Sequence, residues 1–148
     1  MNDRQDAATA RHRLTAAVPR LAVPLGSLAA VGAAFAVVAV VDPNEPGHYP
    51  ACPFLTVAGL YCPGCGGLRS AHAVTQGDLG TALGSNVLAV LLFAAFALGW
   101  LHWAAGAVRG RRYSFPVRLR AWHWWALGAL AVAFTVVRNT PLGVGLAP

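Results

Sequence analysis

The chain has 148 residues, of which 57% are hydrophobic and 11% are charged. Because soluble globular domains usually carry about 25% charged residues, this composition excludes disorder over most of the length and argues against a water-soluble monomer. The net charge of +6 comes from arginine alone, since the chain contains no lysine. The apolar residues form three long blocks, which predicts an all-α integral membrane protein with three transmembrane helices.

The first predicted elements are a tail and a transmembrane helix. Residues 1–20 are polar, Ala-rich and weakly basic, which predicts a mobile cytoplasmic tail. Residues 21–41 form an uncharged apolar run that is long enough to cross about 30 Å of hydrocarbon. This run exceeds the apolar core of a cleaved signal peptide, so we expect an uncleaved first transmembrane helix.

Residues 42–80 are predicted to form an extracytoplasmic loop. Pro43 and Pro46 stop the preceding helix, because proline disfavours helix continuation. All cysteines of the chain lie in this loop, at Cys52, Cys62 and Cys65. Glycines follow the last cysteine and permit a tight turn, after which residues 67–76 are predicted to form a short helix.

The second and third transmembrane helices are predicted at residues 81–103 and 121–138. At about 1.5 Å per residue the third is barely long enough to span. Between them, residues 104–120 form a cytoplasmic loop without an acidic residue, which contains Arg109, Arg111, Arg112, Arg118 and Arg120. Residues 139–148 are predicted to form a short outer tail.

Charge and tryptophan placement give the orientation in the cell membrane. Basic segments alternate with the acidic segment 42–80 across the apolar blocks, which is the positive-inside pattern. The tryptophans flank residues 104–120, where their rings favour the membrane interface: Trp100, Trp103, Trp122, Trp124 and Trp125. We therefore expect a cytoplasmic N-terminus, an outer C-terminus, and anionic lipid head groups, not nucleic acid, as partners of the arginine loop.

Two polar residues lie near the outer ends of the predicted helices. Asn86 is expected to bond a neighbouring helix through its amide. Arg138 is expected to snorkel to the outer interface.

The motif Cys62-Pro63-Gly64-Cys65 is a C-x-x-C turn, which points two sulfurs the same way and suits a metal knuckle or a redox pair. Cys65 lies just before the predicted short helix, whose free N–H groups are expected to lower its thiol pKa. Cys65, Arg69 and His72 share one helical face by their spacing. Arg69 either favours a thiolate or pairs with Asp78 or lipid head groups.

Several short motifs in this segment are specific in combination: Asp42-Pro43, Cys52-Pro53-Phe54, Thr56 with Gly59, and Cys62-Pro63-Gly64-Cys65-Gly66-Gly67-Leu68-Arg69. The combination resembles a bacterial family of small integral membrane proteins of unknown function. In its signature, DP, CPF and CPxCGxTR, the usual Thr is replaced here by Leu68. The resemblance covers residues 42–95 and implies a fold and a membrane location, but no chemistry.

Two of the alternatives for the cysteine segment are chemical. In the first, Cys52, Cys62, Cys65 and His72 bind zinc, since structural zinc takes four such ligands. In the second, Cys62 or Cys65 attacks a substrate disulfide, and the other cysteine of this pair or Cys52 resolves it, which is thiol–disulfide oxidoreductase chemistry.

The third alternative is structural. A disulfide of Cys52 with Cys62 or Cys65, or buried thiols, would pin the loop onto the helix ends. The chain also lacks a P-loop, a G-x-S-x-G motif and an H-E-x-x-H motif. We therefore assign no catalytic residue, and we expect an accessory or scaffold protein that works with a membrane-protein partner rather than an enzyme.

Overall fold

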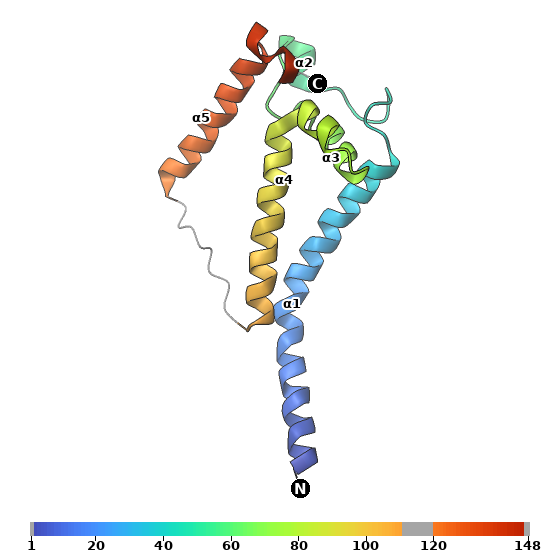
Figure 1. Ribbon diagram of the computed structural model, residues 1–148, viewed down its shortest axis with the longest axis vertical. Coiled ribbons are helices and arrows are strands. Elements are labelled where there is room, and N and C mark those ends of the chain that lie inside the picture. Colours follow the sequence, from blue (N-terminus) through green and yellow to red (C-terminus); the bar gives the residue numbers. More distant parts are fainter. Residues whose placement is uncertain (1, 111–119, 147–148) are drawn as a thin grey trace. The chain divides into compact units, whose positions relative to one another are not determined.

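The computed structural model describes residues 2–110 and 120–146, the side chains of 2–20, 142 and 144 excepted. Every regular element in this part is helical, which confirms the predicted all-α class. The elements are α1 (Asn2–Val40), α2 (Pro53–Ala58), α3 (Gly67–Thr75), α4 (Leu79–Val108), α5 (Ala121–Arg138) and the 3-10 helix η1 (Pro141–Leu146) (Figure 1). Part of the predicted arginine loop, with Arg111, Arg112 and Arg118, lies outside the described residues.

The chain forms two compact units. The first unit consists of Met1–Ala33 and Ala95–Pro116, and the second consists of Ala34–Ala94 and Val117–Pro148. Both α1 and α4 contribute to each unit. The second unit contains all three cysteines, and it is therefore the unit that carries the candidate site.

In the first unit, α1 begins at Asn2, so the predicted tail is helical from residue 2 onward, and its mobility and cytoplasmic location stay predictions. Alanine is the best helix former, and its abundance in this stretch favours the helix over an irregular tail. Further along, the indole N–H of Trp100 donates to the Pro24 carbonyl at 3.0 Å and lies 3.3 Å from the Ser27 hydroxyl. These contacts join α4 to α1 within this unit.

In the second unit, helix boundaries follow local sequence signals. As predicted, α1 ends at Val40, before Asp42-Pro43, and α3 lies within residues 67–76. Asp78 caps the start of α4: one carboxylate oxygen accepts the Thr81 N–H at 2.9 Å and the other accepts the Thr81 hydroxyl at 2.6 Å. This is the usual role of an Asp at a helix N-cap. The same hydrogen bonds keep the pKa of Asp78 below its ordinary value.

A kink interrupts α4 at Asn86, whose backbone is extended (φ −164°, ψ 97°). The Asn86 side chain caps the helix that resumes, because its Oδ1 accepts the Ala89 N–H at 3.0 Å. A helix end leaves carbonyls without intrahelical donors, and the hydroxyl of Ser70 on α3 donates to one of them, Ala82 O, at 2.8 Å. Ser70, Ala82 and Asn86 are all fully buried, so α3 packs closely against α4 here.

Two helices are long and apolar enough to cross a membrane: residues 21–40 of α1, and α4. In each, only 11% of the most apolar stretch is buried within the protein. The 18 residues of α5 include three tryptophans, His123 and Arg138, which lower its hydropathy, and it does not meet the same test. The third span therefore stays a prediction.

Candidate metal centre

The three cysteine sulfurs converge, and all three cysteines are free thiols. The Sγ atom of Cys62 lies 3.5 Å from that of Cys52 and 3.2 Å from that of Cys65. All three sulfurs lie within 4.8 Å of one another. Around a zinc ion with Zn–S bonds of about 2.3 Å, tetrahedral sulfur ligands lie about 3.8 Å apart. The spacing is therefore close to that of three ligands of one ion.

Local sequence explains how the sulfurs are presented. Cys52 is the N-cap of α2, and Pro53 follows at the first helical position, where its fixed φ suits a helix start. The Cys65 N–H donates to the Cys62 carbonyl at 3.2 Å, which closes the turn between the two sulfurs. Gly66 then caps α3 with φ +79°, a conformation that L side chains rarely adopt.

Arg138, at the C-terminal end of α5, donates hydrogen bonds to this turn. Its side chain is only 2% exposed. One guanidinium nitrogen, Nη1, donates to the Cys65 carbonyl at 2.9 Å and to the Cys62 carbonyl at 3.2 Å, and Nη2 donates to Ser85 O at 3.4 Å. The prediction that Arg138 snorkels to the interface is therefore wrong, because these carbonyls satisfy the guanidinium inside the protein.

Asn86 supports the same turn from α4. Its Nδ2 donates to the Pro63 carbonyl and to the Cys65 carbonyl, both at 2.9 Å. The amide thus bonds the cysteine turn before α3, whereas the expected partner was a neighbouring helix. Because buried carbonyls without a donor cost free energy, these bonds favour this one conformation of the turn.

Asn139 fixes the chain just before the turn. The Tyr61 N–H donates to Asn139 Oδ1 at 2.9 Å, and Asn139 Nδ2 donates back to the Tyr61 carbonyl at 2.9 Å. This reciprocal pair ties the start of the cysteine turn to the end of α5, 78 residues later in the chain.

The charge of Arg138 has no carboxylate partner within salt-bridge distance among the described residues. Its Nε is buried without a hydrogen-bond partner, and the guanidinium lies 5.1 Å from the centre of the Phe134 ring. The titratable groups that interact with it electrostatically include Cys62 and Cys65. A buried cation requires compensating charge, and a cysteine thiolate would supply it here.

The thiols differ strongly in acidity. Hydrogen bonds from the Leu55 N–H and from the other two cysteines lower the pKa of Cys52 to about 7. Burial, together with its cysteine neighbours, raises the pKa of Cys65 to about 12. The prediction that Cys65 has the lowered pKa is therefore wrong: the Cys62 N–H donates to its sulfur at 3.3 Å, but desolvation by burial outweighs this bond.

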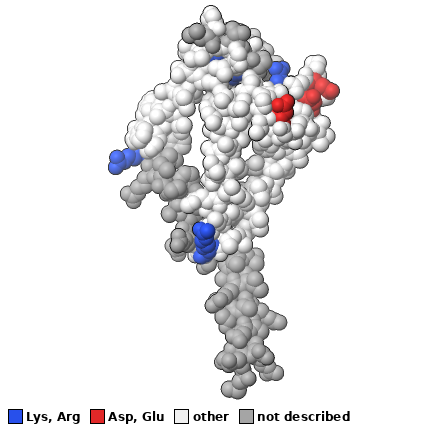
Figure 2. Space-filling view, viewed as in Figure 1, with Lys and Arg blue, Asp and Glu red and all other residues white. Residues whose placement is uncertain are grey.

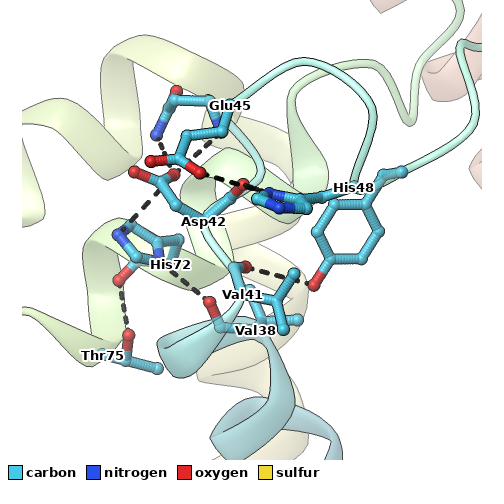
Figure 3. A network of polar contacts seen from close by, with 9 residues as sticks. Val38, Val41, Asp42, Glu45, His48, His72 and Thr75 are labelled. Carbon is cyan, nitrogen blue, oxygen red and sulfur yellow. Dashed lines mark hydrogen bonds and ion pairs between the residues drawn. The ribbon is translucent and has the colours of Figure 1, made fainter.

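His72, on α3, lies apart from the sulfur cluster and contacts the C-terminal end of α1. Its Nδ1 lies 2.8 Å from the Val38 carbonyl and its Nε2 lies 3.8 Å from Asp42 Oδ1 (Figure 3). Asn44 donates twice to the same carboxylate oxygen, through its N–H at 2.8 Å and its Nδ2 at 2.7 Å. Among the described side chains, the group that could hold a metal consists of the three cysteines.

Arg69 and Cys65 line a cavity of about 500 Å³ that also borders Cys52. Arg69 therefore borders the same cavity as Cys52 and Cys65, whereas His72 bonds the end of α1. The sequence analysis missed the cavity and the part that Arg138 plays. The available signal was an ionisable residue at the end of an apolar helix, which commonly faces the protein interior.

Comparison with known proteins supports the resemblance drawn from the motifs. The model of a family described as a protein of unknown function (DUF2752) matches residues 52–100. The match includes all three cysteines and Asn86, and it ends before Arg138 and Asn139. No curated protein and no solved structure matches the chain.

Proposed function

We propose that this protein is a multi-pass protein of the cell membrane whose outer loop binds zinc through Cys52, Cys62 and Cys65. The convergence of the three sulfurs within 4.8 Å of one another carries the proposal. The carbonyls between two of these sulfurs are already held by Arg138 and Asn86, so little rearrangement is needed to receive an ion. The metal would organise the outer loop of a membrane accessory protein.

The chemistry of the ligands favours zinc. Thiolates are soft ligands, which select zinc and copper(I) over calcium or magnesium. Three thiolates around one divalent ion leave a single negative charge, and the buried guanidinium of Arg138 would neutralise it. A monovalent ion would leave a further negative charge in a buried site, which costs free energy.

The second unit supports a topology with three spans and the cysteines outside. The cysteine loop contacts three long helices: His72 bonds the end of α1, Asn86 at the kink of α4 bonds the turn, and Arg138 at the end of α5 bonds the same turn. Asp42, Glu45 and Asp78 lie in the segment that carries the cysteines, and Figure 2 shows acidic side chains gathered in one region, whereas Arg120 precedes the N-terminal end of α5. By the positive-inside rule, the cysteine end faces outward and residues 104–120 face cytoplasmic lipid head groups.

The low burial of the two long apolar helices also supports a membrane location. A soluble protein would bury such helices in its core, but here large side chains such as Leu91, Leu98 and Val40 are exposed. Contiguous exposed apolar surface of this kind is stable in lipid and unstable in water.

The metal proposal is tested by elemental analysis of the full chain, purified in detergent under anaerobic conditions with reductant. We expect about one zinc ion per chain in the wild type and strongly reduced zinc in C52S, C62S and C65S. H72A is the informative control, since His72 lies outside the sulfur cluster and zinc should be retained. Absence of zinc from the wild type, or a wild-type zinc content in the cysteine variants, would refute the proposal.

Thiol–disulfide exchange is the second candidate, favoured by the lowered pKa of Cys52 beside Cys62. The Cys52 thiolate would attack a substrate disulfide and release one substrate thiolate. Cys62 would then attack the mixed disulfide and release the second, so that the substrate gains two electrons and the protein acquires a Cys52–Cys62 disulfide. Because Cys65 lies in the same cluster, a C62S/C65S double variant would trap the mixed disulfide, and its absence from cells would exclude this candidate.

A further inference from the structure

The cavity beside the cysteines is large enough for a small organic molecule. Its volume is about 500 Å³, within the usual range of about 300–1,000 Å³ for small-molecule sites. The loop from Pro43 to Cys52 forms one wall, and the turn from Gly64 to Arg69 forms another. Two of the proposed metal ligands, Cys52 and Cys65, therefore border the same space.

The sulfur cluster supplies one ligand fewer than zinc requires. Zinc takes four ligands, and sites with three protein ligands keep the fourth position for water or substrate. Among the described side chains, no His, Asp or Glu joins the three cysteines. Since Cys52 and Cys65 line the cavity, it offers a small ligand a route to the fourth position.

The cavity walls indicate the chemistry of that ligand. Tyr49, Tyr61 and Leu55 give the walls an apolar character, and Arg69 contributes a positive charge. Glu45 also lines the cavity, but its carboxylate lies 3.5 Å from His48 Nδ1. An anionic ligand with an apolar body fits these walls.

The charges around the site and the softness of its sulfur ligands favour a thiolate as the fourth ligand of the metal. Arg138 neutralises the charge of a zinc ion bound by three thiolates, so a further anionic ligand needs another cation, and Arg69 is the one on the cavity wall. A site of soft sulfur ligands accepts a fourth sulfur more readily than an oxygen ligand.

We infer that the cavity binds a low-molecular-weight thiol whose sulfur occupies the fourth coordination position of the metal; this inference rests on the proposed zinc site. As the S–Zn bond forms, the thiol proton passes to solvent and the water at that position leaves. No electron is transferred, so no oxidant or reductant is required. Arg69 balances the added charge, and the apolar walls hold the organic part of the ligand.

The test uses the full chain in detergent, loaded anaerobically with cobalt(II), whose thiolate charge-transfer absorption reports the number of bound sulfurs. Benzyl mercaptan is the apolar probe and 2-mercaptoethanol is the polar probe. We expect either probe to raise the absorption by about one third, as three sulfurs become four. Benzyl mercaptan should half-saturate at a concentration about tenfold lower, because its ring is buried against the apolar walls.

Two arginine variants make the test specific. R69M should raise the half-saturating concentration of benzyl mercaptan about tenfold, whereas R109M, which removes an exposed arginine far along the chain, should leave it unchanged. Failure to bind cobalt would contradict the zinc site itself. Bound cobalt with an unaltered spectrum, an equal response in R69M, or removal of the cobalt by the thiol would overturn the thiol inference and leave the zinc site standing.

Discussion

Residues of the Cys62–Cys65 turn and of the Asp42–His48 loop line the same cavity, but the two segments are held in different ways. Side chains from α4 and α5, from 21 to 76 residues away in sequence, bind the carbonyls of the turn. The loop is held largely by its own neighbours: Asn44 donates to Asp42, and Glu45 lies beside His48. The turn is thus fixed by tertiary structure, which suits metal ligands, whereas the loop depends mainly on exposed, local contacts, with His72 of α3 as a further contact to Asp42.

The largest effect on zinc affinity is expected from R138M, which removes the cation that is hydrogen-bonded to the turn. The carbonyls of Cys62 and Cys65 each lose one of two donors, and thiolates at the cluster lose their compensating charge. We expect zinc affinity, measured by competition with a chelator, to fall at least about 100-fold, which is about 3 kcal/mol. R138K should lie between, because lysine keeps the charge but not the forked donors. Wild-type affinity in R138M would show that the turn does not depend on α5.

A smaller effect is expected from N86A, which removes two donors to the turn but no charge. The Pro63 carbonyl loses its donor, while the Cys65 carbonyl keeps the bond from Arg138. A buried carbonyl without a donor typically costs about 1–3 kcal/mol, so zinc affinity should fall about tenfold. N44A is the matched control in the local loop and should leave zinc affinity unchanged. An equal loss of zinc affinity in N86A and N44A would contradict the claim that tertiary contacts to the turn matter more for metal binding than local contacts in the loop.

Cysteine alkylation in the metal-free protein tests the acidity difference within the site. Because the folded protein lowers the pKa of Cys52 to about 7, its thiolate predominates above this pH, and its reaction with iodoacetamide should fall as the pH drops through 7. Cys65, with its pKa raised to about 12, should stay protonated and unreactive at neutral pH. Mass spectrometry distinguishes the two sites. A midpoint near 9 for Cys52 would contradict the proposed donors at the start of α2.

The smallest effect is expected from D78A, which removes the cap of α4 and leaves the turn intact. Thermal stability should fall at neutral pH while zinc content stays unchanged, and D78N should retain part of the cap. The fold lowers the pKa of Asp78 below 3.8, so its charged form stabilises the fold above that pH and this contribution is lost as the pH falls through the folded-state pKa. A stability gap between wild type and D78N that persists at lower pH would contradict this assignment.

The sequence predicted those features that depend on neighbouring residues. Pro43 marks the end of α1, and the glycines after Cys65 mark the turn into α3, because backbone restrictions of proline and glycine act locally. The apolar runs likewise identified α1 and α4 as candidate spans.

The candidate site could be predicted only in part. The C-x-x-C spacing placed Cys62 beside Cys65, and Cys52 was included as a third sulfur, which the structure brings to the same cluster. The roles of Arg138 and the desolvation of Cys65 depend on contacts between α5 and the turn, and no local pattern encodes such contacts. The opposite shifts in thiol pKa follow from that burial and were therefore also missed.

X-ray absorption at the zinc edge, on anaerobically purified full-length protein, tests the central claim most directly. The account predicts a first shell with at least three sulfurs at about 2.3 Å, and the sulfur number should fall in C52S. A shell of nitrogen and oxygen alone, or protein whose cysteines are paired in a disulfide and bind no zinc after reduction, would contradict it.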